Sequence, residues 1–278
     1  MSLLNPVAGS RAIWNITSIL YRYRELTWEM TKREFSERYA GQALGVIWGI
    51  AHPLIIVMVY VFVFVFVFGN GARPTNLEFS SDFVVYMLAG LMPWMAFQEV
   101  LAKGTQAIVG NSNLVKQVIF PVEVLPAKGV LSSLLTELVL LTGLMGYMLL
   151  RFHTLPWTVL LLPVLIFFQA VAMLGAALFL SALGAYFRDL KDVVQVFSLI
   201  NVYLMPVVYL PAWVPEPVRP MIGLNPFSYM TWCFQDVFYN GHVAHPSAWF
   251  IFPVLSLVSL AMGYLVFNKL KPYLGNVL

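Results

Sequence analysis

The sequence predicts an all-α integral membrane protein, on the basis of its composition, its long apolar runs and the placement of its charges. Of the 278 residues, 60% are hydrophobic and 10% are charged, whereas about 25% of a typical soluble domain is charged. The 21 Phe, 13 Tyr and 8 Trp residues exclude a disordered chain, because such chains are poor in aromatic residues. The single cysteine, Cys233, excludes an internal disulfide scaffold, and a net charge of +3 is too weak for a nucleic-acid binder.

Six apolar runs are long enough to cross a bilayer as helices. About 20 residues, each rising 1.5 Å, cross the ~30 Å hydrocarbon core. The first run contains VFVFVFVF at 61–68, which alternates as a strand does. We interpret it as helix, because an isolated strand in lipid leaves its backbone unpaired. The predicted spans are about 43–68, 83–109, 122–150, 157–186, 193–213 and 248–267, within one domain covering 1–278.

The segment 214–240, between the fifth and sixth runs, is hydrophobic but interrupted by turn-forming residues. Breaks at Pro215, Pro217, Pro220, Gly223 and Pro226 leave pieces that are too short to cross a bilayer. Irregular backbone at membrane depth is tolerated only where it is buried in protein or lines a cavity. We therefore predict a re-entrant hairpin, or a pair of interfacial half-helices, in this segment.

The placement of the basic residues predicts the orientation of the spans. Six spans put both termini on the same side, and assigning that side to the cytoplasm places 13 of the 16 Lys and Arg residues there. The remaining three, on the outer side, are Arg73, Arg151 and Arg219. The positive-inside rule therefore predicts that both termini are cytoplasmic.

An amphipathic helix, the collar, is predicted at about 18–40, before the first span. At 100° per residue, Tyr21, Trp28, Phe35 and Tyr39 form an aromatic stripe along one face. A helix with such a stripe and a charged remainder lies in the membrane interface, with its rings at headgroup level. The alternative is that the stripe packs against the spans.

The predicted cytoplasmic loops are short. The loop Gly110–Pro121 favours a two-turn helix that Asn111 or Ser112 begins and the proline ends. No loop is large enough for a catalytic domain, and the chain contains no GxxxxGK[ST] phosphate loop. The sequence therefore predicts no ATPase activity of its own, so that any chemical energy it uses comes from another polypeptide.

Two groups of titratable residues outside the spans resemble sites. His242 and His245 are three residues apart with only Asp236 nearby, and we interpret them as loop histidines rather than metal ligands. Asp189 and Asp192 lie in the link before the fifth span. Capping of the following helix is favoured there over an acid–base pair.

Ionisable residues within the predicted spans are costly and are therefore functional candidates. Glu99 and Lys103 are four residues apart in the order that lets them neutralise each other, which favours a structural pair. Glu137 stands alone in LSSLLTELVLLTG at 131–143, and facing spans offer only polar groups such as Gln169. Proton-coupled transport through Glu137 is therefore an alternative function.

The phenylalanines of the first span divide between two faces when the span is a helix. Phe62 and Phe66 share one face, while Phe64 and Phe68 share nearly the opposite one. One pair is able to face lipid while the other faces an internal path, where aromatic rings offer flat apolar surfaces to ligands such as sugar rings. Simple packing against neighbouring helices is the equal alternative.

Five segments, in order and with matching spacing over nearly all of the chain, resemble the permease subunits of type-2 ABC transporters that export polysaccharides. These are the exporters of O-antigen, capsule and teichoic acid. The segments are TKREFSERYAGQALGVIWGIAHPL (31–54), VKQVIFPVEVLPAKGVLSSL (115–134), AYFRDLKDVVQVF (185–197), MPVVYLP (205–211) and LNPFSYMTWCFQDVFYNG (224–241). Ala40 and Gln42 stand where the family often has a basic residue and a small hydroxyl, which affects local surface charge.

The resemblance implies a homodimer in the bacterial cytoplasmic (inner) membrane, in which each copy engages a separate ATP-binding subunit. That subunit would bind ATP and Mg²⁺, and this chain would bind no cofactor or metal and would not be an enzyme. The implied substrate is a glycan on a lipid carrier, passed through a conduit between the two copies. Within the type-2 ABC transporters, a permease for a drug, haem or a small lipid is the alternative.

The resemblance also implies roles for individual residues. A coupling helix at about 111–119 would dock into the ATPase together with the collar, and the outer gate would lie in 214–240. The implied ATPase-coupling residues are Asn111, Ser112, Asn113, Leu114, Val115, Lys116, Arg33 and Glu37. The conduit candidates are Phe62, Phe66, Phe197 and Tyr203, and the outer-gate residues are Asn225, Pro226, Phe227, Tyr229 and Trp232.

Overall fold

The computed structural model describes residues 6–37, 47–67, 82–117 and 120–277. Within these ranges the regular elements are all helices, as the composition predicts. Four of them are long and apolar enough to cross a membrane. They are α4 (Phe83–Gln106), α6 (Val124–Phe152), α7 (Leu162–Gly184) with the 3₁₀ turn Trp157–Leu161 before it, and α11 (Pro246–Leu270).

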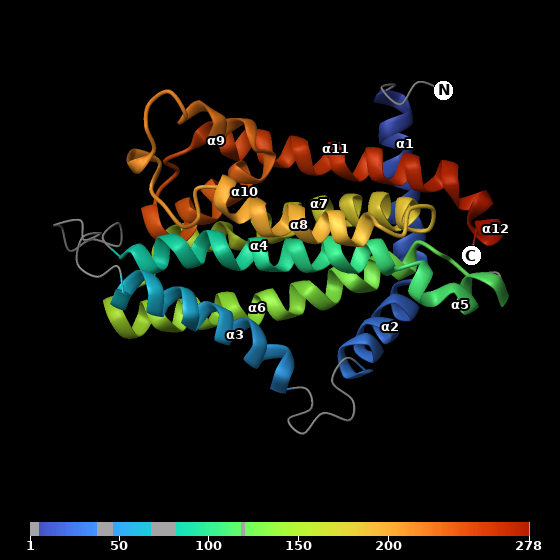
Figure 1. The fold of residues 1–278 in the computed structure, drawn as a ribbon, viewed down its shortest axis with the longest axis horizontal. Helices are drawn as coiled ribbons and strands as arrows, with labels where there is room; N and C mark the ends of the chain where they lie inside the picture. Colours follow the sequence, from blue (N-terminus) through green and yellow to red (C-terminus); the bar gives the residue numbers. More distant parts are fainter. Residues whose placement is uncertain (1–5, 38–46, 68–81, 118–119, 278) are drawn as a thin grey trace.

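The first predicted span is helical as far as it is described. It consists of α3 (Trp48–Val61) followed by the π-helical turn Phe62–Val67, so the alternating Val-Phe run takes helical form through Val67. This agrees with the requirement that backbone groups in lipid be satisfied within the segment. Figure 1 shows α3 beside α4 and α6, at the edge of a bundle whose long helices run along the molecule.

The fifth predicted span is a regular helix over only part of its length. The helix α8 (Leu190–Leu204) has 15 residues, which at 1.5 Å per residue is about 22 Å, shorter than the ~30 Å core. It ends because Met205 precedes Pro206 and is extended, with φ −100° and ψ 154°. The residue before a proline is disfavoured in the helical region, and the proline itself has no N–H to donate.

The irregular backbone after α8 is buried, and side chains of other elements satisfy its carbonyl groups. Tyr86 Oη, on α4, donates to the Pro206 carbonyl at 2.9 Å and to the Tyr209 carbonyl at 3.1 Å. Gln235 Nε2 donates to the same Pro206 carbonyl at 2.7 Å. These bonds meet the condition under which non-helical backbone is tolerated at membrane depth.

Short helices follow this break. They are a 3₁₀ turn (Pro211–Trp213), α9 (Pro220–Leu224), α10 (Pro226–Gln235) and a π-helical turn (Asp236–Asn240). The longest, α10, has ten residues, too few to cross a bilayer. It packs against α4 and α11, and α9 and α10 lie towards the same end of the molecule (Figure 1).

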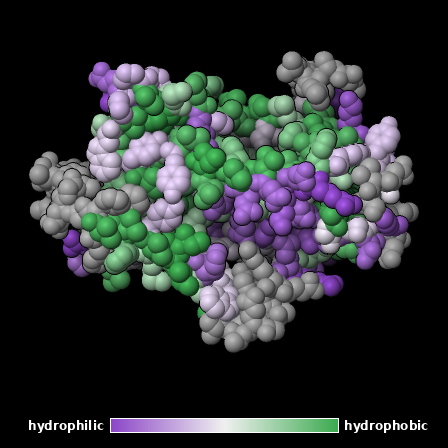
Figure 2. Space-filling model, in the orientation of Figure 1, coloured by the Kyte–Doolittle hydropathy of each residue, from purple (hydrophilic) through white to green (hydrophobic). Residues whose placement is uncertain are grey.

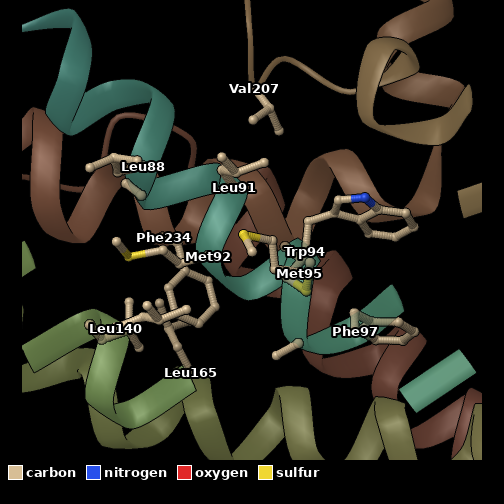
Figure 3. Close-up of a cluster of buried hydrophobic side chains, with 14 of the residues drawn as sticks. Leu88, Leu91, Met92, Trp94, Met95, Phe97, Leu140, Leu165, Val207 and Phe234 are labelled. Carbon is tan, nitrogen blue, oxygen red and sulfur yellow. The ribbon is translucent and has the colours of Figure 1, made fainter. Parts of the chain in front are cut away.

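The helix α4 forms the centre of the hydrophobic core, because it packs against α6, α7, α8 and α10. Figure 3 shows its apolar side chains pointing in several directions, towards residues of these neighbours and of the irregular segment. A helix that is apolar on all sides is suited to such a buried position. The labelled residues are Leu88, Leu91, Met92, Trp94, Met95 and Phe97 of α4, with Leu140, Leu165, Val207 and Phe234 around them.

The N-terminal region contains two helices where the sequence analysis expected one collar helix. A turn at Tyr23 separates α1 (Pro6–Arg22) from α2 (Arg24–Glu37). The apolar face of α1, including Ala12 and Ile16, packs on α11 in a second hydrophobic cluster with Phe267 and Leu274. The helix α1, which crosses α11 at one end of the molecule (Figure 1), was not predicted from the sequence.

The aromatic side of the collar faces outward. Thr27 is buried on the side of α2 that packs against α6. Tyr21 and Trp28 are 71% and 44% exposed. Tyr21 lies on α1 and Trp28 on α2, so the two rings do not belong to one continuous helix, and the interface position of the stripe stays a prediction. The Phe35 side chain and Tyr39 lie outside the described residues.

The loop after α4 and the C-terminus complete the helical elements. A 3₁₀ turn (Val109–Asn111) leads into the short helix α5 (Ser112–Gln117), and residues 118–119 of the predicted coupling helix lie outside the described residues. At the C-terminus a 3₁₀ turn (Lys271–Tyr273) and α12 (Leu274–Val277) follow α11. In Figure 1, α5, α12 and α2 lie towards one end of the molecule, opposite α9.

Glycines allow α7 and α11 to pack backbone against backbone. A Cβ added to Gly263 would lie 2.0 Å from the carbonyl oxygen of Gly175, and one added to Gly175 would lie 2.3 Å from the carbonyl carbon of Ser259. Ser259 Oγ also donates to the Ala172 carbonyl at 3.0 Å. Small residues and interhelical hydrogen bonds are the usual basis of helix association in lipid.

Replacing Gly263 by alanine is expected to destabilise the protein by forcing α7 and α11 apart. Overpacking of this kind costs about 1–3 kcal/mol, so the melting temperature of the detergent-solubilised protein should fall. Gly143→Ala on α6 is the matched control, because a Cβ there meets no atom within 4 Å. Thermal denaturation followed by size-exclusion chromatography measures both, and equal melting temperatures for the two variants would contradict the role of this contact.

Candidate functional site

A cavity of about 560 Å³ lies between α3, α4, α6 and α8. This volume is in the range of ligand-binding pockets. Part of the wall is apolar, with Ile56, Met95, Leu140 and Leu199. The polar and charged residues of the wall are His52, Gln98, Glu99, Ser133, Thr136, Glu137, Lys191, Gln195 and Ser198.

The surface of the bundle is not uniformly apolar around this cavity. Figure 2 shows hydrophilic residues gathered over the right-hand ends of α4 and α8 and above α2, with hydrophobic residues covering much of the remaining visible surface of the bundle. Polar side chains at membrane depth face a bundle interior or a water-filled cavity rather than lipid. This part of the molecule is therefore suited to a polar path or to contact with another subunit.

The predicted pair of Glu99 and Lys103 forms, and it belongs to a larger network. Lys103 Nζ lies 3.1 Å from Glu99 Oε1 and 3.4 Å from Glu34 Oε1, and it donates to Ser132 Oγ. Lys128 Nζ lies 3.3 Å from the second oxygen of Glu34. The network thus joins the collar helix α2 to α4 and α6, and sequence spacing on a single helix could not reveal the contribution of Glu34.

Glu137 is fully buried at the side of the cavity. Its Oε2 accepts a hydrogen bond from Gln169 Nε2 at 2.9 Å, and the same amide nitrogen donates to the Pro93 carbonyl at 3.2 Å. Its Oε1 has no hydrogen-bond partner within the described parts of the chain. The carboxyl is therefore held by a neutral amide, and part of its hydrogen-bonding capacity remains unused.

The short helix α5 has one face attached to the body of the molecule and one face free. Val115 packs against the second hydrophobic cluster, while Asn113, Leu114 and Lys116 are exposed. The Asn111 side chain also contacts the preceding helix, because its Nδ2 donates to the carbonyl of Ala107 at the end of α4. The exposed face of α5 is available to a partner.

Two further coupling candidates lie on α2. Arg33 is exposed, and Glu37 is the last residue of the helix, with a side chain outside the described residues. Asp189 and Asp192, at the start of α8, are also exposed. Asp189 occupies the position before the first helical residue but makes no capping hydrogen bond, so the capping interpretation of its side chain was wrong.

The conduit candidates lie on open faces of the protomer. Phe62, Phe197 and Tyr203 are between 42% and 59% exposed. The ring of Phe197 lies 6.0 Å from that of Phe227 in α10. The side chain of Phe66 lies outside the described residues. The faces of α3 and α8 that these rings occupy are open to lipid, to substrate or to a second copy.

The gate candidate Asn225 joins α8 to α10. Its Oδ1 accepts from the Phe227 amide at 3.1 Å, which caps α10, and its Nδ2 donates to Asn201 Oδ1 of α8 at 2.8 Å. Pro226 occupies the first turn of α10, where a missing N–H has no consequence. Tyr229 Oη donates to a backbone carbonyl of α9 at 2.8 Å. The segment 214–240 is therefore connected to α8 through side-chain hydrogen bonds.

Comparison with known proteins agrees with this architecture. Residues 25–239 match the family described as ABC-2 type transporter. The chain belongs to this family. An O-antigen export system permease protein RfbA of Myxococcus xanthus is 30% identical over 253 residues, which are 90% of this chain and 94% of that protein. A protein of the same name from Klebsiella pneumoniae is 25% identical over 253 residues, 90% of this chain and 93% of that protein.

In this ABC-2 permease, Asp236 anchors the segment 214–240 to α11. Its buried carboxylate accepts from the backbone N of His245 at 3.0 Å, from His245 Nδ1 at 2.9 Å, from Trp249 Nε1 at 2.9 Å and from Asn240 Nδ2 at 2.8 Å. The ring of the gate candidate Trp232 stacks on the His245 imidazole at 5.4 Å. One carboxylate thus fixes the π-helical turn, the following loop and the start of α11.

These contacts also account for the two loop histidines. His245 is a hydrogen-bond partner of Asp236, and His242 Nδ1 lies 2.8 Å from the Asn240 carbonyl. Among the residues that the structure describes, no group of three or more His, Cys, Asp and Glu side chains is arranged to hold a metal ion. The interpretation of the pair as loop histidines agrees with this geometry.

The hydrogen bonds to Asp236 make its ionised form the stable one in the folded protein. Burial raises the pKa of this carboxyl, but the hydrogen bonds from His245, Asn240 and Trp249 outweigh burial and hold the pKa below its usual value. A group with a lowered folded-state pKa stabilises the fold above its unfolded-state pKa of about 3.9, and this stabilisation is lost as the pH falls through the folded-state pKa.

Asp236→Asn is therefore expected to lower the melting temperature of the permease at neutral pH, because the amide removes the charge and offers a donor where only acceptors fit. A hydrogen bond to a charged group contributes about 1.5–3 kcal/mol. The difference from the wild type should shrink as the pH falls below about 4. Glu216→Gln, at an exposed position of the same segment, is the control. A difference that does not change with pH would contradict the proposed role of the charge.

Proposed function

We propose that this chain is the transmembrane permease subunit of an ATP-driven exporter that moves a lipid-linked polysaccharide across the bacterial cytoplasmic (inner) membrane. The substrate class is that of O-antigen, capsular polysaccharide and teichoic acid. The observation that carries the proposal is the match to three relatives named O-antigen export system permease protein, each over 253 residues and 90% of this chain. Membership of the ABC-2 family supports ATP as the energy source, used by a separate ATP-binding subunit.

In the proposed complex, two copies of this chain bind two ATP-binding subunits, which hold ATP and Mg²⁺. The free face of α5 supports this docking role, because exposed Leu114 lies between the polar residues Asn113 and Lys116. On its other face, Val115 packs into the cluster that α1 and α11 share. A displacement of α5 by the ATPase would therefore reach these helices directly, and α4 through the hydrogen bond of Asn111.

We further propose six spans, with α3 and α8 as the first and fifth and with both termini in the cytoplasm. The clustering of α2, α5 and the C-terminal helix at one end of the molecule supports this topology (Figure 1). In this topology, α9 and α10 form the re-entrant outer gate. Their short lengths and the buried, side-chain-satisfied backbone after α8 are the features that support a re-entrant position.

The conduit is proposed to lie where the open faces of α3 and α8 meet their counterparts in the second copy. Only four residues of α8, Val194, Ser198, Asn201 and Val202, are buried within this chain. A second copy and a substrate between the copies would cover the remaining faces, which present Phe197 and Tyr203. Aromatic rings suit a path for sugars because they offer apolar surface without buried charge.

No observation favours proton-coupled transport over ATP-driven export. A proton relay needs a series of titratable groups, whereas the Glu137 carboxyl is hydrogen-bonded to the neutral amide of Gln169. Glu99 lies in the cavity wall and forms an ion pair with Lys103, which also forms an ion pair with Glu34.

Val115→Pro is expected to uncouple transport from ATP hydrolysis without preventing insertion. Proline in the interior of a helix costs about 3 kcal/mol and removes a backbone hydrogen bond, so α5 should lose its shape while the spans remain. Surface polymer and the level of the permease in membranes are the measurements, and Val115→Ala is the control that keeps the helix. Normal export by Val115→Pro would remove α5 from the coupling role.

A clean deletion of this chain tests the proposed function itself. We expect surface polymer to disappear and lipid-linked polymer to accumulate inside the cell, with both effects reversed by the wild-type chain. Extraction of the lipid fraction and staining of the surface polymer measure the two pools. The purified chain alone should hydrolyse no ATP. Surface polymer at its normal level in the deletion strain would refute the proposal.

A further inference from the structure

The exposed face of α1 carries positive charge that is not neutralised within the described chain. The helix contains Arg11 and Arg22 and no acidic residue. Both side chains are exposed, and neither belongs to an ion pair among the residues that the structure describes. Arg24 follows at the start of α2, with its guanidinium 4.8 Å from the centre of the Tyr21 ring. This face is therefore suited to an anionic partner.

The two arginines of α1 lie on the same side of the helix. At 100° per residue, a line of four residues falls within about 60°, and all four are exposed: Arg11, Asn15, Ser18 and Arg22. We call this line the basic stripe. The hydroxyl of Ser18 is satisfied within α1, because it donates to the Asn15 carbonyl at 2.8 Å. The stripe thus presents two guanidinium groups, about three turns apart, on one surface.

Two aromatic rings flank the basic stripe. Trp14 and Tyr21 are 74% and 71% exposed, and the helical repeat places both on the same edge of the stripe. Exposed rings of this size are unfavourable in water, whereas Trp and Tyr are enriched where lipid headgroups meet the hydrocarbon. Basic residues on a polar face, with aromatic residues beside them, are typical of a helix that lies on an anionic membrane surface.

The remaining face of α1 determines where this surface lies. Ala12 and Ile16 pack into the cluster that includes Tyr264 and Phe267 of α11, which is long and apolar enough to cross a membrane. Figure 1 shows α1 running across α11 rather than along it. Because α11 spans the bilayer in the proposed topology, α1 there lies along the membrane plane, near the cytoplasmic end of α11. The basic stripe points away from α11.

An anionic phospholipid accounts for both the arginines and the rings of this surface. The cytoplasmic leaflet has a negative surface potential, which attracts basic side chains next to a membrane span. Guanidinium groups also bind phosphate oxygens through paired hydrogen bonds. An acidic face of a protein partner would match the arginines, but α1 lies against the side of a spanning helix, where lipid headgroups are the nearest neighbours. Lipid is therefore the favoured occupant.

We propose that α1 is a docking surface for anionic phospholipids, in which Arg11 and Arg22 bind headgroup phosphates. The rings of Trp14 and Tyr21 lie among the same headgroups. The inference rests on the topology of the proposed function and does not depend on which polymer is exported. The bound lipid holds α1 against α11. Because Val115 of α5 packs into the same cluster as α1, the lipid also steadies the surface on which the proposed coupling helix rests.

Lipid binding by the purified, detergent-solubilised permease tests this surface. The melting temperature is followed while dioctanoyl phosphatidylglycerol is added, with dioctanoyl phosphatidylcholine as the neutral comparison. We expect Arg11→Gln/Arg22→Gln to weaken the apparent affinity for the anionic lipid at least fivefold. Arg151→Gln/Arg219→Gln is the matched control, because it removes the same charge from two exposed residues outside α1. Equal affinities in the wild type and the α1 variant, or an equal loss in the control, overturn the proposal.

A second measurement keeps both arginines. Ser18→Cys places a spin label on the basic stripe of the permease in nanodiscs of phosphatidylcholine and phosphatidylglycerol, and its collisions with oxygen and with a water-soluble nickel chelate measure its depth. We expect the label at the level of the lipid phosphates, with at least twofold more chelate collisions when phosphatidylglycerol is omitted. A label in bulk water overturns the proposal. Cys233 is fully buried, and the unsubstituted protein gives the background labelling.

The outcomes separate the lipid surface from the proposed function. Unchanged lipid affinity in Arg11→Gln/Arg22→Gln overturns the surface alone, because the measurement needs no polymer. Normal surface polymer in the deletion strain overturns the export function instead. If the variant loses the ATP-binding subunit on purification while its lipid affinity is unchanged, the basic stripe binds protein and the proposal is overturned. If the variant does not fold, the depth of the Ser18→Cys label decides.

Discussion

The need to satisfy every backbone hydrogen bond away from water governs this structure more than any single packing contact. It keeps the Val-Phe run of the first span helical through Val67. It also explains why the break after α8 is tolerated, since Tyr86 and Gln235 donate to the Pro206 carbonyl and Tyr86 also donates to the Tyr209 carbonyl. The side chains of α4 and α10 thereby determine where the fifth span can stop.

The partners of the buried carboxyl groups differ along the length of the bundle. Near the collar, charges are paired across helices, as in the bridge from Glu34 to Lys103 and Lys128. At mid-depth, Glu137 is held only by an amide. At the opposite end, Asp236 is surrounded by four donors. Ion pairs and charge-assisted hydrogen bonds therefore link neighbouring helices at the two ends of the bundle.

The sequence allowed prediction of features that local rules decide. Run length located α4, α6, α7 and α11 to within a few residues, and spacing found the ion pair of Glu99. The helix α1 was not predicted, because its apolar face is recognised only from its packing against α11. The predicted fifth span ran past Leu204, where α8 ends, because the number of apolar residues in a run does not register that Pro206 stops the helix. The sequence named Gln169 only as one polar group of a facing span, and its hydrogen bond to Glu137 could be found only in the three-dimensional structure.

The hydrogen bonds that close the break after α8 have a mechanical consequence for the outer end of the path. Asn225 joins α10 to α8, and Gln235 joins α10 to the Pro206 carbonyl. Moving α10 away breaks these two hydrogen bonds, so that in an apolar setting the side-chain amides lose their partners, while the Pro206 carbonyl keeps the hydrogen bond from Tyr86. Water is the available replacement, because it both donates and accepts. In the proposed conduit, opening of this end and entry of water are therefore a single event.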